Sequence, residues 1–289
     1  MLERIPVAGF SLFPYFYRNM QMKCNNFFYL IVIISSASCN NNGSAERDSN
    51  GMPTIPVPIN LSYTIVAQHP KDTSAYTQGL EIYQGKLYES TGDWGNSSLR
   101  IIDLKTGNVA KKHVMGTDKI FGEGITILNN KIYQLTWLSN IVYVYDINDI
   151  TKPIQILKWP HEGWGITNNG KDLIISDGSD HLYFADPADL TIRKTLPVLS
   201  YKGPITALNE LEYIDGYVFA NVYQQDYIVK IDLVNGQVIA VMIMDNLLQS
   251  NEKIAGRTDV LNGIAYDSAT KTMLITGKRW PKIFEVKLN

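Results

Sequence analysis

The sequence predicts an all-β fold, a five-bladed β-propeller closed by a strand from the N-terminal side of the folded region. Three observations lead to this prediction. From about Leu61 onward, no useful stretch shows the 3.6-residue periodicity of a helix. A pattern of strand-like runs recurs five times at intervals of 41 to 53 residues, which is typical of propeller blades. The fifth repeat ends after its third run, whereas one spare run, 61–67, precedes the first repeat.

Composition bounds the class of protein. The chain has 289 residues, of which 45% are hydrophobic and 19% charged, an ordinary globular balance. Lysine plus arginine (26) against aspartate plus glutamate (28) leaves a net charge of −2, so there is no basic excess with which to follow a nucleic-acid backbone. The two cysteines, Cys24 and Cys39, lie near the N-terminus, which excludes disulfide scaffolds, zinc ribbons and Cys-X-X-Cys redox sites.

The N-terminal segment 1–39 is predicted to be an export signal. From Met22, which is an alternative start, one lysine precedes an apolar run at 27–34 that is too short to span a bilayer, and small residues then lead to Cys39. Ser-Ala-Ser-Cys resembles the lipobox of bacterial lipoproteins, with Ser36 in place of the usual leucine. We expect lipidation of Cys39 and a periplasmic or cell-surface lipoprotein of a bacterium, with an ordinary secretory peptide as the alternative. A polar, flexible tether, 40–60, is expected to connect this segment to the propeller, 61–289.

Each repeat contains three recognisable strand-like runs. The first runs begin with Gln-Gly-Leu-Glu, Glu-Gly-Ile-Thr, Trp-Gly-Ile-Thr, Asn-Glu-Leu-Glu and Asn-Gly-Ile-Ala, at residues 78, 123, 164, 209 and 262. The second runs are 86–90, 131–137, 172–176, 217–222 and 272–276. The third runs are 98–103, 141–146, 181–186, 227–232 and 283–288, and turn signals such as Lys-Thr-Gly at 105–107 close most of them. The run 61–67 would supply the missing fourth strand of the last blade and remove an exposed edge.

One repeat position is predicted to form a site. The first strand of every blade lines the central channel, so equivalent positions converge on one pore mouth. Five unlike, mostly polar residues at one register point to a site, although polar groups that merely hydrate the channel are the alternative. The residues at this position are Gln78, Glu123, Trp164, Asn209 and Asn262.

The motifs around these positions resemble one enzyme family. In order, they are 76–81, 89–92, 121–126, 134–137, 162–167, 176–179, 208–212, 261–265 and 276–281. Together they resemble the glutaminyl cyclases of plant and bacterial type, also called glutamine cyclotransferases, over about 61–289. That family is a five-bladed propeller, which agrees with the repeat count.

The resemblance implies an acyltransferase that converts the N-terminal glutamine of peptides or proteins to pyroglutamate and releases ammonia. The α-amine attacks the side-chain amide carbon within one residue, so the enzyme must supply the right conformer, desolvation and proton transfer. Glu123 matches the family's proton-transferring glutamate. Trp137 and Trp164 match its aromatic walls, and Gln78 and Asn209 match its substrate-holding amides. Lys278 matches a lysine that binds a substrate carbonyl or the forming oxyanion.

Without the resemblance, these residues have plainer interpretations. Glu123 fits a buried capping carboxylate, the two tryptophans fit a core, and Lys278 fits a surface lysine. Tyr76 and Tyr223 depart from the family, which often has phenylalanine and tryptophan there. Both keep an aromatic face and add a hydroxyl, which bears on substrate preference rather than on the reaction.

Metal-free catalysis without a required cofactor is the expectation. The four histidines, at positions 69, 113, 161 and 181, form no metal-ligand spacing, and no nucleophile elbow, P-loop or dinucleotide fingerprint is present. A structural calcium in the channel is a further option. The expected partners are peptides with N-terminal glutamine and a membrane through Cys39, and the protein is expected to be a monomer.

Two other functions remain open from the residues. A calcium-dependent lactonase-like hydrolase could use Glu123, Asn209 and Asn262 as oxygen ligands, although such propellers have six blades and five repeats are counted here. A non-catalytic binding lipoprotein is the other alternative.

Overall fold

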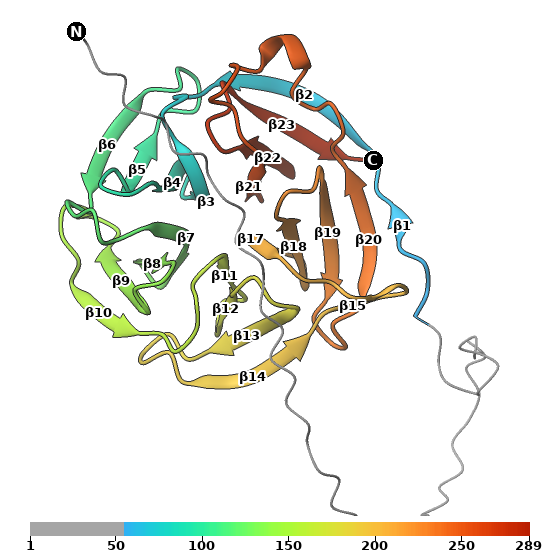
Figure 1. Ribbon diagram of the computed structural model, residues 1–289, viewed down its shortest axis with the longest axis horizontal. Helices are drawn as coiled ribbons and strands as arrows, with labels where there is room; N and C mark the ends of the chain where they lie inside the picture. The colour runs from blue at the N-terminus through green and yellow to red at the C-terminus, as the bar shows by residue number, and fades with distance from the viewer. Residues whose placement is uncertain (1–54) are drawn as a thin grey trace, which may run out of the picture. The chain divides into compact units, whose positions relative to one another are not determined.

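Five blades of four antiparallel strands each surround a central axis in the computed structural model, which describes residues 55–289, and one further strand joins the fourth blade (Figure 1). Each of blades 1 to 4 takes its strands consecutively from the inside of the ring outward. Blade 1 contains β3 (Tyr76–Tyr83), β4 (Lys86–Gly92), β5 (Ser98–Ile102) and β6 (Val109–Val114). Blade 2 contains β7 (Gly122–Leu128), β8 (Lys131–Thr136), β9 (Ile141–Asp146) and β10 (Gln155–Lys158).

The next two blades repeat this order. Blade 3 contains β11 (Ile166–Asn168), β12 (Leu173–Ser176), β13 (His181–Ala185) and β14 (Ile192–Pro197). Blade 4 contains β17 (Leu208–Ile214), β18 (Tyr217–Val222), β19 (Tyr227–Asp232) and β20 (Val238–Ile243). A short ribbon of β15 (Leu199–Ser200) and β16 (Gly203–Pro204) joins the two blades, and a 3₁₀ turn, η1 (Ser250–Glu252), precedes blade 5.

The N-terminal strand closes the ring, as the sequence predicts. Blade 5 contains β21 (Leu261–Asp267), β22 (Thr272–Gly277), β23 (Lys282–Leu288) and, as its outer strand, β2 (Tyr63–Pro70). β2 pairs antiparallel with β23 along its length, and Figure 1 shows the two ends of the propeller side by side there. Because β2 pairs with β23, the hydrogen-bonding edge of β23 is not exposed.

The ordered sheet begins slightly before the predicted boundary at residue 61. Ile59 and Asn60, which the sequence analysis places in the tether, form β1 and pair in parallel with β20 of blade 4. The predicted signal segment, the alternative start at Met22, Cys39 and tether residues 40–54 lie outside the described residues. No helix in the described part of the chain is long and apolar enough to cross a bilayer.

Apolar packing between adjacent blades holds the ring together. Five buried clusters occur among residues 55–289, and each joins side chains from two neighbouring blades. Between blades 2 and 3, for example, Leu135 and Val142 pack with Leu173 and Ile175, and all four are fully buried. Burial of one such aliphatic side chain contributes about 1.5–3 kcal/mol. The inner strands therefore stay in fixed register around the channel.

The inner strands are interrupted near one end of the channel. In four blades the pairing of the first two strands shifts by a β-bulge, a feature that turns side chains away from the regular alternation of a strand. In blade 3, Trp164 and Gly165 come just before β11, and their backbones pair with Ser176 at the end of β12. The four register shifts lie between Thr77 and Gly79, Gly122 and Ile125, Leu208 and Leu211, and Leu261 and Ile264.

Close approach of the inner strands depends on glycine at two of these positions. A Cβ on Gly124 would lie 2.9 Å from the Trp164 carbonyl oxygen, and one on Gly165 would overlap the carbonyl oxygen of Asn209. Real Cβ atoms do not approach backbone this closely, so a side chain here would push neighbouring blades apart. The glycines that follow Glu123 and Trp164 therefore let the inner strands converge on a narrow mouth.

Candidate active site

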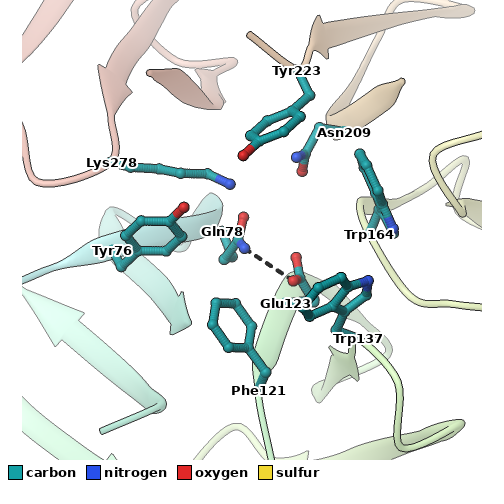
Figure 2. Close-up of a pocket in the computed structure, with 9 residues that line it drawn as sticks. All are labelled: Tyr76, Gln78, Phe121, Glu123, Trp137, Trp164, Asn209, Tyr223 and Lys278. Atoms are coloured by element: carbon teal, nitrogen blue, oxygen red, sulfur yellow. Dashed lines mark hydrogen bonds between the residues drawn. The ribbon is translucent and has the colours of Figure 1, made fainter. Parts of the chain in front are cut away.

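A cavity of about 360 Å³ opens at the bulged end of the channel (Figure 2). This volume is in the range of small-molecule sites. The cavity contains all eight residues that the sequence analysis assigns to substrate binding or catalysis, and it also contains Phe121. The lining residues are Tyr76, Gln78, Phe121, Glu123, Trp137, Trp164, Asn209, Tyr223 and Lys278.

Two sets of repeated positions supply the polar and aromatic side chains. Gln78, Glu123 and Asn209 lie in the bulges of the inner strands. Trp137, Tyr223 and Lys278 each follow directly after the second strand of a blade. Their backbone N–H groups donate hydrogen bonds of 3.0, 2.8 and 2.9 Å, respectively, to backbone carbonyl oxygens of the same blade. Each of these carbonyls lies two residues before the residue in the bulge of that blade. The second set therefore also occupies a repeated position, the one directly after the second strand of a blade.

Glu123 is the buried acid of the cavity, with only 4% of its surface exposed. Gln78 Nε2 donates a hydrogen bond of 3.0 Å to Glu123 Oε1, and Asn262 Nδ2 lies 3.4 Å from Gln78 Oε1. This chain of amides orients Gln78 with its donor toward the carboxyl group. Burial raises the pKa of Glu123 well above its ordinary value, Lys278 opposes that shift, and Glu162 adds to it.

Lys278 is the buried cation of the cavity, with 2% of its surface exposed. Its Nζ lies 4.8 Å from the ring centre of Tyr76 and 4.9 Å from that of Tyr223, so two aromatic faces hold the ammonium group. Burial lowers the pKa of Lys278 to about 8, against the opposing charges of Glu123 and Asp259. The cavity thus contains an acid whose pKa is raised and a base whose pKa is lowered.

Five aromatic rings form the other walls. Phe121 packs edge-on against Tyr76 and Trp137, with ring centres 6.0 and 5.8 Å apart, and Trp164 packs edge-on against Tyr223 at 5.8 Å. These rings line most of the surface that a ligand would meet, so the polar atoms in the cavity are few and directed. Figure 2 shows the hydroxyl of Tyr223 pointing into the same space as the ammonium of Lys278.

Glu162 fixes both tryptophans and was not assigned a role from the sequence. Its Oε2 accepts the indole N–H of Trp137 at 2.8 Å and that of Trp164 at 3.0 Å. Because one carboxylate holds two rings from different blades, it sets the width of the aromatic wall. Glu162 precedes Trp164 by two residues, but the sequence carries no sign that Trp137 is its second partner.

Asn209 offers a free acceptor. Its Oδ1 is buried and has no hydrogen-bond partner among residues 55–289. A buried oxygen without a partner is costly, so such an atom in a cavity is suited to receive a donor from a ligand. The described residues contain no group of three or more histidine, cysteine, aspartate or glutamate side chains placed to hold a metal ion.

The fold and the cavity together define a propeller enzyme with a desolvated acid–base site for a small group. A profile described as glutamine cyclotransferase matches residues 32–288. A glutaminyl-peptide cyclotransferase of Arabidopsis thaliana is 40% identical over 228 residues, which cover 78% of this chain and 70% of that protein. The crystal structure of Myxococcus xanthus glutaminyl cyclase superposes with a TM-score of 0.75 at 29% identity, over 80% of this chain and 98% of that one. The chain belongs to the glutamine cyclotransferase family.

Proposed function

We propose that this protein is a glutaminyl-peptide cyclotransferase in which Glu123 relays the proton. The observation that carries the mechanism is a buried carboxyl group with a raised pKa, hydrogen-bonded by Gln78 and enclosed by aromatic rings. Family membership supports the reaction, because the matched relative is named for it. Neither the five-bladed ring nor the family match favours the lactonase-like alternative.

The reaction needs one bond made, one bond broken and one proton moved. The neutral α-amine nitrogen of the N-terminal glutamine attacks the side-chain amide carbon, and the carbonyl oxygen takes up negative charge. The Glu123 carboxylate accepts a proton from the attacking nitrogen and returns it to the amide nitrogen. The bond between the amide carbon and the amide nitrogen then breaks, which releases ammonia and leaves the five-membered lactam as the product. A carboxyl group with a raised pKa suits both directions of this transfer.

The other residues hold and stabilise the reacting groups. Asn209 Oδ1 is positioned to accept a substrate N–H group, since it has no partner in the described chain. Lys278, between two tyrosine rings, stabilises the developing oxyanion while it is protonated. Trp137 and Trp164 exclude water and restrict the side chain to the folded conformer that brings amine and amide together.

A Glu123→Gln variant tests the assignment. It keeps the shape and the hydrogen bond of Gln78 but cannot relay the proton. We expect kcat to fall by about 10²–10⁴-fold, the usual contribution of general acid–base catalysis. Ammonia release from a Gln-initiated peptide, with product mass, measures it. Glu285→Gln is the matched control, because Glu285 is a partly buried carboxylate bonded by His69 and Thr272, away from the cavity. Activity within threefold of wild type in Glu123→Gln would overturn the role of Glu123.

Metal-independent catalysis is part of the proposal. It rests on the acid–base pair of the cavity, which accounts for the proton and charge steps. Incubation with EDTA is expected to leave turnover unchanged. Loss of activity with EDTA would show a catalytic metal, whereas a lower melting temperature with unchanged turnover would show a structural cation such as calcium.

Export and lipid anchoring at Cys39 complete the proposal. The support is in the sequence, which has one lysine, a short apolar run and Ser-Ala-Ser-Cys. A Cys39→Ser variant is expected to leave the membrane fraction and appear in the soluble exported fraction. Retention in the membrane would contradict the lipid anchor.

A further inference from the structure

A second cavity, of about 380 Å³, lies beside the candidate active site and is cationic. It lies over blade 1 and the loops of blade 5, and its lining includes four basic residues and one carboxylate. This concentration of positive charge is local, since the whole chain has a net charge of −2. The charged residues are Arg100, Lys112, Arg257, Arg279 and Asp93. We call this cavity the cationic groove.

The Tyr76 ring lines the active-site cavity, and Arg279 of the cationic groove lies against the same ring. On the Tyr76 ring, Lys278 Nζ lies 4.8 Å from the centre and the Arg279 guanidinium carbon 5.3 Å from it. The two cations are therefore at most about 10 Å apart, since each lies about 5 Å from the same ring. An extended peptide advances about 3.3–3.6 Å per residue, so roughly three residues cover that distance.

The loop between β4 and β5 forms the rim between the two cavities. Asp93 of this loop lines the cationic groove. Its neighbour Trp94 is 46% exposed and packs on Phe121 and Trp137, with ring centres 5.3 and 6.4 Å apart. A peptide whose first residue occupies the active-site cavity can thus leave over the exposed Trp94 ring toward the groove.

Two of the four basic side chains form no ion pair in the described chain. Arg100 pairs with Asp72 at 2.9 Å, and Arg279 pairs with Asp93 at 3.1 Å. Lys112 and Arg257 form no ion pair within residues 55–289. Burial, followed by the charge of Arg100, lowers the pKa of Lys112, and the charges of Asp72 and Glu89 oppose this shift.

We propose that the cationic groove binds carboxylate side chains at the second to fourth positions of the substrate peptide, so that the enzyme prefers N-terminal glutamine followed by acidic residues. This inference rests on the proposed cyclotransferase function. Arginine matches a carboxylate with two parallel hydrogen bonds, and lysine adds a point charge. The groove contributes to binding before and during reaction equally, so its effect falls on KM rather than kcat.

Three peptides that differ only at positions 2 to 4 test the inference, with glutamate, glutamine or lysine there. With the full-length protein, kcat/KM is expected to be two- to thirtyfold higher for the acidic peptide than for the neutral one, the range expected for two partly exposed ion pairs. Added salt is expected to reduce this ratio. In Arg257→Glu/Lys112→Glu, the acidic-to-neutral ratio is expected to fall below one. Lys158→Glu, at an exposed lysine in β10 of blade 2, is the matched control and should keep the wild-type ratio.

The outcomes separate the two proposals. No turnover of any peptide, the neutral one included, would refute the cyclotransferase function. Turnover of the neutral peptide with an acidic-to-neutral ratio of one would refute the groove alone. A ratio that persists in Arg257→Glu/Lys112→Glu would also refute it, because the preference would then arise elsewhere.

Discussion

Replacement of Lys71 by methionine is expected to lower the free energy of unfolding by about 3 kcal/mol. Lys71 follows the closing strand β2, and its Nζ lies 3.5 Å from Glu89 Oε1, with the two side chains only 3% and 2% exposed. The ammonium also lies 3.4 Å from the carbonyl oxygens of Ala75 and Gly277. Each of these carbonyls directly precedes a residue of the active-site cavity. One buried cation therefore connects ring closure to two walls of that cavity.

The magnitude follows from what remains after the substitution. Removing one partner of a buried ion pair costs about 3–5 kcal/mol, because the other charge is left uncompensated. The lower end applies here, since Glu89 keeps the hydroxyl of Thr77 at 2.7 Å and a guanidinium nitrogen of Arg100 at 3.8 Å. Methionine also keeps most of the aliphatic volume. A Lys71→Met/Glu89→Gln double variant leaves neither charge unpaired, so its loss should be smaller than the sum of the single losses by about 1 kcal/mol or more.

Equilibrium unfolding in urea measures these values. The midpoint is expected to fall with an unchanged slope, as for a loss of stability without a change in the surface exposed. Lys158→Met, at an exposed lysine, is the control and should stay within about 0.5 kcal/mol of wild type. A Lys71→Met protein as stable as wild type would refute the reasoning, and so would strictly additive losses in the double variant.

Three further predictions concern the cavity and its supports. The value of kcat/KM should rise with pH as Glu123 loses its proton and fall above pH about 8 as Lys278 loses its own. Lys278→Arg should move only the alkaline limb of this profile, toward higher pH. An alkaline limb that stays in place would contradict this. Glu162→Gln should shift the acid limb to lower pH, because it removes a charge that raises the pKa of Glu123. Glu162→Ala should in addition raise KM, because both indoles lose their hydrogen-bond acceptor. Identical KM values in the two variants would show that Glu162 does not hold the indoles in place. Gly165→Ala should lower the free energy of unfolding by about 3 kcal/mol because its Cβ would overlap the Asn209 carbonyl, while Gly170→Asn, at a φ of +82° with no atom nearby, should have little effect on the urea midpoint.

Ring architecture was predictable because its signals are local and repeated. Alternating strand runs, turn residues and a five-fold recurrence are visible without any knowledge of long-range contacts. Pairing of β2 with β23 confirms the predicted closure, which followed from one missing strand and one spare strand. Only the start of the ordered sheet was misplaced, because Ile59 and Asn60 lack a strand-like pattern and pair through their backbone with β20.

The site was predictable in part. The shared repeat position identified Gln78, Glu123 and Asn209, and the family resemblance added residues that follow the second strands, such as Lys278. Phe121 lies within the motif 121–126, but no local pattern marks it as a site residue, because its place depends on contact with a glycine of blade 1: a Cβ on Gly92 would overlap its ring. Glu162 was missed because its two indole partners come from different blades.

The sequence by itself determined the number of blades, the strand that closes the ring and the residues that reach the channel mouth, because each depends on order and period along the chain. Tertiary structure alone decided which side chains face one another there. A strand with regular alternation would place neighbouring residues on opposite faces, but bulges turn the site residues into the channel. Burial among those neighbours, which no local pattern records, then raises the pKa of Glu123 and lowers that of Lys278, and so sets the chemistry of the cavity.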